Sequence, residues 1–370
     1  MKKNGKGGEY DLIKEKVKNL PSTPGVYLMK DARGSIIYVG KAKNLKRRVQ
    51  SYFQQSKAHP QKIIKLVSNI RDFDILLTDT EFEAFMLECK LIRDIKPLFN
   101  KMMKSPQSYS YIAINKDRQY PDIVITNHRD EQDGKLYFGP FPSKARVETA
   151  IIGIKEAFKI LCSNPKRQDS LCFNHSIGLC IGMCGGGPAL QKYHAIMEDI
   201  IALLNTENSL ILDAMKKKMA EVSADFDFEA AARYRDRIDA IQFLLRKEKV
   251  IEFTEENKNI VVLENLSENT FKLFLIKRSE ILFSKIVNYD SAEVNQLSSL
   301  ITTTFNHTAF PSGSHIKRDE IDEAQIIYNY LKSSHCRYKT IPDKWITNHK
   351  DLSIENAVTK LIYKKQTIKK

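Results

Sequence analysis

Two short apolar segments near the start of the chain, GVYLM and IIYVG, each place a tyrosine close to a glycine. The turn-forming stretch DARG separates them, and this pattern predicts that residues 26–30 and 35–39 pair as a β-hairpin. Because side chains alternate between the two faces of a strand, Tyr27 and Tyr38 can share one face if the register allows. The dense basic run KAKNLKRR follows at residues 41–48, which brings cations next to the phenols.

Helical spacing follows the hairpin. Residues 44–55 predict a helix that turns Leu45 and Val49 toward the sheet and keeps Arg48 and Tyr52 together on another side. A further strand is expected near residues 73–78. Thr80 and Glu83 form a capping-box pattern, so a helix is expected at 81–95, ending before Pro97. Residues 1–105 are therefore expected to form a compact α/β domain.

A helical wheel of residues 81–95 places Glu88 inside an apolar arc. The arc consists of Phe82, Phe85, Cys89, Ile92 and Ile95. A carboxylate on a buried face is costly unless it is paired or binds a cation. Phenols, cations and one such carboxylate suit phosphodiester hydrolysis, in which the carboxylate holds Mg²⁺, cations stabilise phosphate charge, and a tyrosine directs or deprotonates water. The alternative is a core tyrosine pair, a solvated basic helix and a buried Glu88–lysine salt bridge.

The charge of the chain is concentrated at its start. The formal net charge is +14, and residues 1–105 hold 22 Lys and Arg against 11 Asp and Glu. A positive field of this kind favours a nucleic-acid partner, although a basic surface can also serve solubility. There is no apolar run of about 18 residues and no apolar segment after the basic start, so we expect a cytoplasmic protein without a transmembrane helix or secretory signal.

The rest of the chain predicts an α+β multidomain fold with three further regions. Residues 106–205 are expected to form a linker and cysteine-rich region, with strands at 110–114 and 122–126, a turn-rich stretch YFGPFPSK, and helices at 144–161 and 189–205. Residues 206–248 read as a helical hairpin with its turn at 225–227. Residues 249–370 are expected to form an α/β segment with a three-stranded antiparallel sheet within 259–287 and helices at 320–333 and 352–363.

Four of the six cysteines lie within 23 residues, at Cys162, Cys172, Cys180 and Cys184. Four thiolates with glycines between them are ligand-like, and both tetrahedral zinc and a [4Fe–4S] cluster use four cysteines. The spacing does not decide between these metals. His175 could serve as a substitute ligand, and the alternative is that the cysteines are small buried residues.

The first 100 residues resemble the GIY-YIG nuclease domain of the UvrC family, the incision subunit of bacterial nucleotide excision repair. The segments that carry the resemblance are PGVYLMKD, IIYVGKAKNLKRRVQSYF and EAFMLECKLIRDIKPLFN. It implies catalytic roles for six residues and makes Glu88 the single protein ligand of Mg²⁺ or Mn²⁺. The six are Tyr27, Tyr38, Lys41, Arg48, Tyr52 and Asn100. Lys43, Lys46 and Arg47 are expected to contact DNA, and the segment CFNHSIGLCIGMC makes an iron–sulfur cluster the better choice at the cysteines.

The hairpin at 206–248 resembles the UVR motif through which UvrB and UvrC bind each other. Since two helices cannot bury both of their faces alone, a partner surface is expected, with Phe226 and Phe228 as anchors; the alternative is a hairpin packed on its own chain. The segment 250–370 resembles the part of UvrC that follows this motif, and the RNase H-like and helix-hairpin-helix regions are not found. The resemblance therefore implies Cho-like nicking of damaged duplex DNA on the 3′ side of a lesion. The rival hypotheses are a non-cleaving UvrB-binding accessory protein and a mobile-element nuclease.

Overall fold

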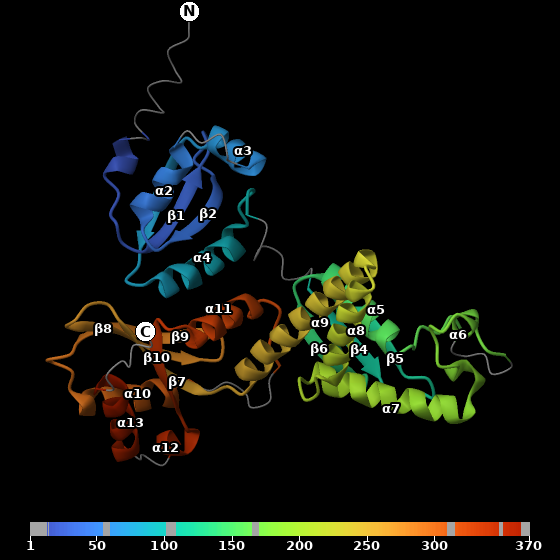
Figure 1. The fold of residues 1–370 in the computed structure, drawn as a ribbon. Helices are drawn as coiled ribbons and strands as arrows, with labels where there is room; N and C mark the ends of the chain where they lie inside the picture. Colours follow the sequence, from blue (N-terminus) through green and yellow to red (C-terminus); the bar gives the residue numbers. More distant parts are fainter. Residues whose placement is uncertain are drawn as a thin grey trace, which may run out of the picture. The chain divides into compact units, whose positions relative to one another are not determined.

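The computed structural model describes residues 13, 15–54, 60–100, 109–164, 170–308, 315–347 and 351–363. The contacts within the chain divide it into two compact units (Figure 1). One unit combines Met1–Ser105 with Thr254–His315 and Asp319–Lys370, and the other comprises Pro106–Phe253 and Ile316–Arg318. The chain therefore leaves the first unit after its N-terminal segment and returns to it after completing most of the second.

The predicted hairpin and its helix are confirmed. β1 (Gly25–Lys30) lies between β2 (Ile36–Ala42) and β3 (Asp72–Leu77), and both neighbours run antiparallel to it. The register pairs Tyr27 with Gly40 and Met29 with Tyr38, so the two tyrosines are diagonal neighbours on one face. Helix α2 (Leu45–Phe53) follows. A short helix that the sequence did not predict, α3 (Gln61–Asn69), precedes β3.

Helix α4 (Glu81–Ile95) begins at the predicted capping box, in which Thr80 and Glu83 bond each other's backbone N–H groups. The single apolar face predicted for it is wrong. Ala84 and Ile92 pack with Val39 and other residues of β1 and β2. Phe82 and Cys89, which are also buried, lie on another side of the helix, and Ile95 is 36% exposed. The helix is therefore covered on two sides, since its second apolar face packs on the C-terminal part of the same unit.

The C-terminal part of the first unit is a four-stranded antiparallel sheet with helices on both faces. The strands are β7 (Asn259–Asn265), β8 (Thr270–Lys277), β9 (Glu280–Asn288) and β10 (Cys336–Ile341), in the order β10-β7-β8-β9. The helices are α10 (Val294–Asn306), α11 (Ile321–Lys332), α12 (Asp343–Thr347) and α13 (Asp351–Tyr363). Three strands and two helices agree with the prediction, whereas β10 and α10 were not expected.

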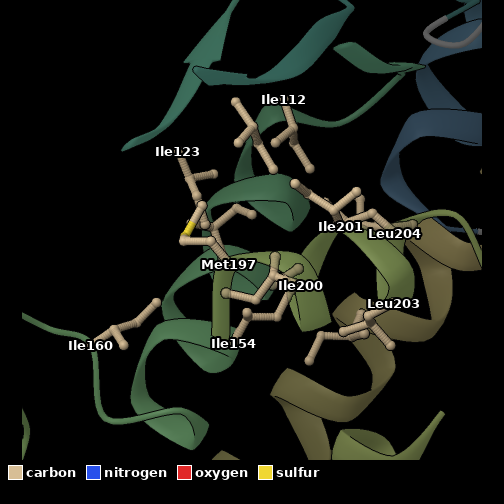
Figure 2. Packing of buried hydrophobic residues seen from close by; sticks show 14 of the residues in the cluster. Ile112, Ile123, Ile154, Ile160, Met197, Ile200, Ile201, Leu203 and Leu204 are labelled. Carbon is tan, nitrogen blue, oxygen red and sulfur yellow. The ribbon is translucent and has the colours of Figure 1, made fainter. Parts of the chain in front are cut away.

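The second unit packs a three-stranded sheet against helices. Its strands, in the order β5-β4-β6, are β4 (Ser110–Asn115), β5 (Asp122–Thr126) and β6 (Leu136–Phe141). Its helices are α5 (Lys144–Ala157), α6 (Phe173–Ser176), α7 (Gly187–Leu204), α8 (Leu210–Ala224) and α9 (Phe228–Glu255), with a 3₁₀ turn at Met183–Gly185. Figure 2 shows Ile112 and Ile123 of the sheet facing Met197 and Ile201 of α7. The stretch expected to form turns instead forms β6.

None of the helices in the described part of the chain is both long enough and apolar enough to span a bilayer.

Candidate active site

The pairing of tyrosines with glycines in β1 and β2 has a steric cause. Tyr27 is buried, and a Cβ atom built on Gly40 would lie 2.3 Å from the Tyr27 hydroxyl. A Cβ on Gly25 would lie 2.4 Å from the carbonyl oxygen of Leu76 in β3. Glycine is therefore required at both positions, because any side chain would displace the phenol or the neighbouring strand.

Three phenols gather on the face of the sheet beneath α2. The ring centroids of Tyr27, Tyr38 and Tyr52 are 5.8–6.3 Å apart. The hydroxyls of Tyr27 and Tyr52 are 2.9 Å apart and hydrogen bonded. Arg48 donates from Nε to the Tyr27 hydroxyl and from a terminal nitrogen to the Tyr52 hydroxyl, both at 3.3 Å. The i,i+4 relationship predicted for Arg48 and Tyr52 thus places a guanidinium over the phenols.

Burial raises the pKa of all three phenols. The pKa of Tyr27 rises to about 12, mainly because its ring is removed from water and also because Tyr38 lies beside it; Arg48 opposes this shift. Burial is also the main cause of the raised pKa values of Tyr38 and Tyr52. The phenols are therefore neutral near pH 7, so each can donate or accept a hydrogen bond but carries no anionic charge.

Glu88 reaches the same site from α4. Its Oε1 atom accepts a hydrogen bond of 3.1 Å from the backbone N–H of Lys41, at the end of β2. Burial raises the pKa of the Glu88 carboxyl, while Lys41 and Arg48 oppose the rise. The described residues contain no second carboxylate that groups with it as a three-ligand metal site. A cation bound here would therefore have fewer than three carboxylate, histidine or cysteine ligands from the described residues and would complete its shell with waters, a coordination that Mg²⁺ accepts.

Lys41 points to the rim of the site. Its ammonium lies 2.6 Å from Oε1 of Glu81 and 4.7 Å from the centre of the Phe85 ring. The hydrogen bond from Lys41 is the main reason why the pKa of Glu81 is lowered. The sequence analysis did not single out Glu81, although the capping pattern places it in the first turn of α4.

Asn100 holds the backbone of β2. Its side-chain oxygen accepts the N–H of Val39, and its side-chain nitrogen donates to the Val39 carbonyl, both at 2.9 Å. β2 is an end strand of its sheet, so this amide satisfies backbone groups that have no strand partner on that side. This contact links the end of α4 to β2, the strand that carries both Tyr38 and Lys41.

An open pocket of about 1360 Å³ joins these groups. Tyr27, Tyr38, Arg48, Glu88 and Asn100 line it, together with Lys41 and the basic residues Lys43 and Arg47. Tyr52 and Lys46 are not among the described lining residues. Tyr52 is joined to the site by the hydrogen bond between its hydroxyl and that of Tyr27. Sequence analysis missed Ser22, Ser51 and Lys62 at this surface. Lys62 could have been found only from the lysines and apolar residues at helical spacing in QKIIKLVSN, the segment that forms α3.

The C-terminal part of the first unit contacts the helix that carries Glu88. Lys272 of β8 is buried, and its ammonium lies 2.5 Å from Asp79 and 2.8 Å from Glu83, at the start of α4. Phe82 packs edge-to-face on Phe274, with ring centroids 5.3 Å apart. These contacts hold the N-terminal turn of α4 on the side opposite to the one that packs on β1 and β2.

The cysteines of the second unit converge. The Sγ atoms of Cys162, Cys172 and Cys184 all lie within 4.8 Å of one another. Cys180 lies outside this group of three, and its sulfur accepts the N–H of Gly182 at 3.4 Å. The ring of His175 lies 2.9 Å from the carbonyl oxygen of Cys180. The histidine is thus engaged with backbone, whereas three of the four predicted ligands are already grouped.

The thiols of this cluster differ in their pKa values. Burial raises the pKa of the Cys172 thiol, but the backbone N–H groups of Ser163 and His175 and the neighbouring thiols outweigh burial and lower it below its ordinary value. Burial raises the pKa values of Cys162 and Cys180. A thiolate stabilised by backbone N–H groups, with further thiols around it, has the character of a metal-binding site.

The helical hairpin is only partly free. Ile238 and Ile241 of α9, with Leu212 of α8, are buried in the core of the second unit. The prediction that the hairpin needs an outside partner to cover its apolar residues is therefore wrong for this part of the hairpin, which packs on its own chain. At its tip Phe226 is 78% exposed and Phe228 is 65% exposed, with ring centroids 6.2 Å apart. Leu210, at the start of α8, is 74% exposed as well, so the described hairpin has exposed apolar side chains at its turn and at the start of its first helix.

Family models match three consecutive segments of the chain. Residues 23–101 match the UvrC-like GIY-YIG domain, residues 109–203 match the middle domain of the UvrC/Cho excinuclease, and residues 210–242 match the UvrB/uvrC motif.

Curated relatives agree over most of the chain. The UvrABC system protein C of Acetivibrio thermocellus is 33% identical over 329 residues, which cover 86% of this chain and 52% of the relative. That of Clostridioides difficile is 33% identical over 341 residues, covering 89% of this chain and 56% of the relative. The chain thus spans about half the length of the curated relatives it matches.

A solved structure, the GIY-YIG N-terminal endonuclease domain of UvrC from Thermotoga maritima bound to magnesium, is 33% identical to this chain. The match covers 25% of this chain and 98% of that domain, with a TM-score of 0.23. The three family models lie one after another along the chain, and the two relatives described above match 86% and 89% of its length. This chain therefore belongs to the UvrC family.

Proposed function

We propose that this chain is a cytoplasmic, divalent-metal-dependent endonuclease of nucleotide excision repair, which nicks damaged duplex DNA on the 3′ side of a lesion in concert with UvrB. The observation that carries the proposal is the convergence of a guanidinium, two phenols and a half-buried carboxylate on one open pocket, with the third phenol hydrogen bonded to the first. Family membership supports the reaction and the repair pathway.

Glu88 is the proposed ligand of Mg²⁺ or Mn²⁺. Burial disfavours the charge of its carboxyl and raises the pKa, so a cation beside it would recover the electrostatic cost. A bound divalent ion would supply Lewis-acid stabilisation of the phosphate and a more acidic water. The Lys41 N–H, 3.1 Å from Oε1, orients the carboxylate toward the pocket.

The remaining residues of the pocket have distinct proposed roles. Arg48 stabilises the negative charge that develops on the phosphate, because its guanidinium is already held over the site. The neutral phenols of Tyr27, Tyr38 and Tyr52 orient the attacking water, and Asn100 fixes β2. Lys41 neutralises charge at the rim. Lys43, Lys46 and Arg47 contact the DNA backbone.

The cysteine cluster is proposed to hold a metal through Cys162, Cys172, Cys180 and Cys184. A [4Fe–4S] cluster is the first choice, with zinc as the alternative. The three grouped sulfurs and the low pKa of Cys172 support a thiolate-bound metal. Cys180 would join as the fourth ligand through a small movement of its loop.

UvrB is the proposed partner at the hairpin tip. Phe226 and Phe228 are large apolar side chains that remain exposed although the hairpin base is packed. A few buried aromatic side chains dominate the energy of many interfaces, so each is expected to act as an anchor.

The test is a lesion-bearing duplex with each strand end labelled separately, incubated with Mg²⁺ and this 370-residue chain, with and without UvrB. We expect a single nick 3′ of the lesion that UvrB stimulates. Phe228→Ala should weaken UvrB binding by about 1–2 kcal/mol and suppress the stimulated nick while sparing weak background nicking. UvrB binding without any nick would identify a non-cleaving accessory protein instead, and unchanged binding by Phe228→Ala would remove the tip as the docking site.

A further inference from the structure

A second groove, of about 780 Å³, lies between β10 and α13 in the first unit. β10 is an end strand of the four-stranded sheet. The charged and aromatic side chains that line the groove are Arg337, Tyr338 and Lys339 from the strand and Lys360 and Tyr363 from the helix. The described residues of this groove and those of the catalytic pocket do not overlap.

The groove is cationic. None of its described lining residues is acidic. Within the described chain, Lys339 and Lys360 have no carboxylate partner, in contrast to Lys41 and Lys272, which form ion pairs. Residues 332–370 hold ten Lys and Arg against three Asp and Glu, a net charge of +7 out of +14 for the chain. A groove with uncompensated ammonium groups attracts an anionic ligand.

The groove also presents free aromatic surface. Tyr363, in the last turn of α13, is 60% exposed. Tyr338 is 40% exposed, but it leaves β10 on the face opposite to Lys339 and Ile341, which lie on the side that packs on α13. Neither ring stacks on another ring or on a cation in the part of the chain that the structure describes. Arg337 is held in place instead, since it donates to Asn265 and to the Tyr289 hydroxyl, both at 3.1 Å. Exposed tyrosines beside unpaired lysines are typical of surfaces that bind unpaired nucleotides, because bases stack on the rings while lysines meet the phosphates.

The groove begins near the catalytic pocket. His335, which immediately precedes β10, lies close enough to Glu81 to contribute to the lowering of the Glu81 pKa. The acidic groups at this junction have partners. Glu81 pairs with Lys41, and Glu264 accepts a hydrogen bond of 2.6 Å from the Tyr330 hydroxyl. A strand that leaves the catalytic pocket could therefore pass this junction and enter the groove.

We propose that the groove between β10 and α13 binds an unpaired segment of a DNA strand, with Lys339 and Lys360 on phosphates and Tyr363 stacked on a base. A continuous duplex would leave Tyr363 without a ligand, because its bases are already stacked on each other. The proposal rests on the proposed function in one respect, that the bound strand belongs to the DNA substrate. The binding step itself needs no metal and no cleavage.

The experiment measures binding of fluorescently labelled dT12 by anisotropy in EDTA, so that no strand is cut, for the full chain and three variants. Lys339→Gln combined with Lys360→Gln should reduce the magnitude of the salt dependence, log Kd against log salt, by about 1.4, because two phosphate contacts are lost from a single strand. Tyr363→Ala should weaken binding by about 5-fold or more, as expected for one lost base–aromatic stack. Lys285→Gln, on the opposite end strand β9, is the matched control and should change binding less than 2-fold.

Two further measurements identify the ligand class. Ultraviolet cross-linking of dT12 to the full chain should attach nucleotides to the peptide that contains Tyr363, and an acidic peptide of 12 glutamates should compete poorly. Parent-like binding and salt dependence in the β10 and α13 variants would overturn the proposal, as would equal competition by the acidic peptide. Thermal unfolding of each variant checks its fold. Nicking by the parent chain is measured separately in Mg²⁺. Loss of nicking with intact dT12 binding would contradict the nuclease assignment alone, and unchanged dT12 binding by the variants would contradict the groove proposal alone.

Discussion

Phe82 of α4 stacks face to face on Tyr330 of α11, with ring centroids 3.8 Å apart and ring planes 4° from parallel. The two residues are separated by more than 240 positions, yet they lie in one compact unit. Arg93, near the other end of α4, donates at 2.6 Å to the backbone of Asp319, which precedes α11. The helix that positions Glu88 is thus clamped between the catalytic sheet and the C-terminal part of the chain.

This clamp predicts that Phe82→Leu weakens metal use as well as stability. Loss of the aromatic stack should lower the free energy of unfolding by about 0.5–1.5 kcal/mol. It should also raise the Mg²⁺ concentration for half-maximal nicking, because α4 is less firmly held. Urea unfolding and a metal titration measure the two effects. Phe305→Leu, on the buried face of α10, is the control and should cost stability only. An unchanged metal titration for Phe82→Leu would show that the stack does not position Glu88.

Arg48→Ala is expected to slow cleavage by about 10²–10³, the loss typical of a donor directed at developing charge. Arg48→Lys should restore the rate only in part, because an ammonium cannot bond the Tyr27 and Tyr52 hydroxyls as the planar guanidinium does. Single-turnover nicking rates at saturating protein separate this effect from DNA binding. If Arg48→Ala cleaved at the rate of the parent chain, Arg48 would have no catalytic role and would only contribute surface charge.

The Lys41–Glu81 pair predicts a pH effect. Since the hydrogen bond from Lys41 lowers the pKa of Glu81 below 4.5, the pair stabilises the folded chain at any pH above the unfolded-state pKa. That contribution is lost as the pH falls through the lowered pKa of the folded state. Lys41→Met should move the pKa of Glu81 back up, which carboxyl NMR during acid titration detects. Lys65→Met, on the exposed side of α3, should leave it unchanged, and an unmoved Glu81 in Lys41→Met would refute the pairing.

Anaerobically purified protein is expected to absorb broadly near 400 nm, as thiolate-ligated iron–sulfur centres do. Replacement of Cys180 by alanine should remove the absorbance and loosen residues 170–186, because a fourth ligand is lost. The metal content and the absorption spectrum are measured for the parent chain and for Cys180→Ala. Cys336→Ala, in the first unit, is the matched control and should keep the colour. A colourless parent with one zinc per chain would select zinc, and a parent free of metal would reject the site.

Local rules made much of the catalytic sheet predictable. The hairpin follows from two short strands and one turn, although its register was left open, and the neighbouring positions of Arg48 and Tyr52 follow from helical spacing. The capping box fixed the start of α4 at the predicted residue, so Glu88 could be placed on the helix before any contact was known.

Contacts between distant segments were not predictable from the same rules. The second apolar face of α4 packs on β8 and α11, which lie far away in the sequence. The helical wheel therefore could not separate this face from the one that packs on β1 and β2. The bonds of Asn100 to Val39 involve residues 61 positions apart, and no periodic pattern indicates them. β10 was missed because Arg337 and Lys339 give CRYKTI too little apolar character, although pairing with β7 makes it a strand.

The measurement that tests the central claim most directly compares Glu88→Gln with the parent chain on one lesion-bearing duplex. Nicking is followed across a Mg²⁺ titration, and duplex binding is measured by anisotropy in EDTA. The substitution removes the one proposed metal-ligating charge and leaves the basic residues around the pocket intact. We predict that Mg²⁺-dependent nicking disappears at all metal concentrations, while DNA affinity stays within a few fold of the parent. Nicking by Glu88→Gln at the parent rate would contradict the assignment of this pocket as a metal-dependent nuclease site.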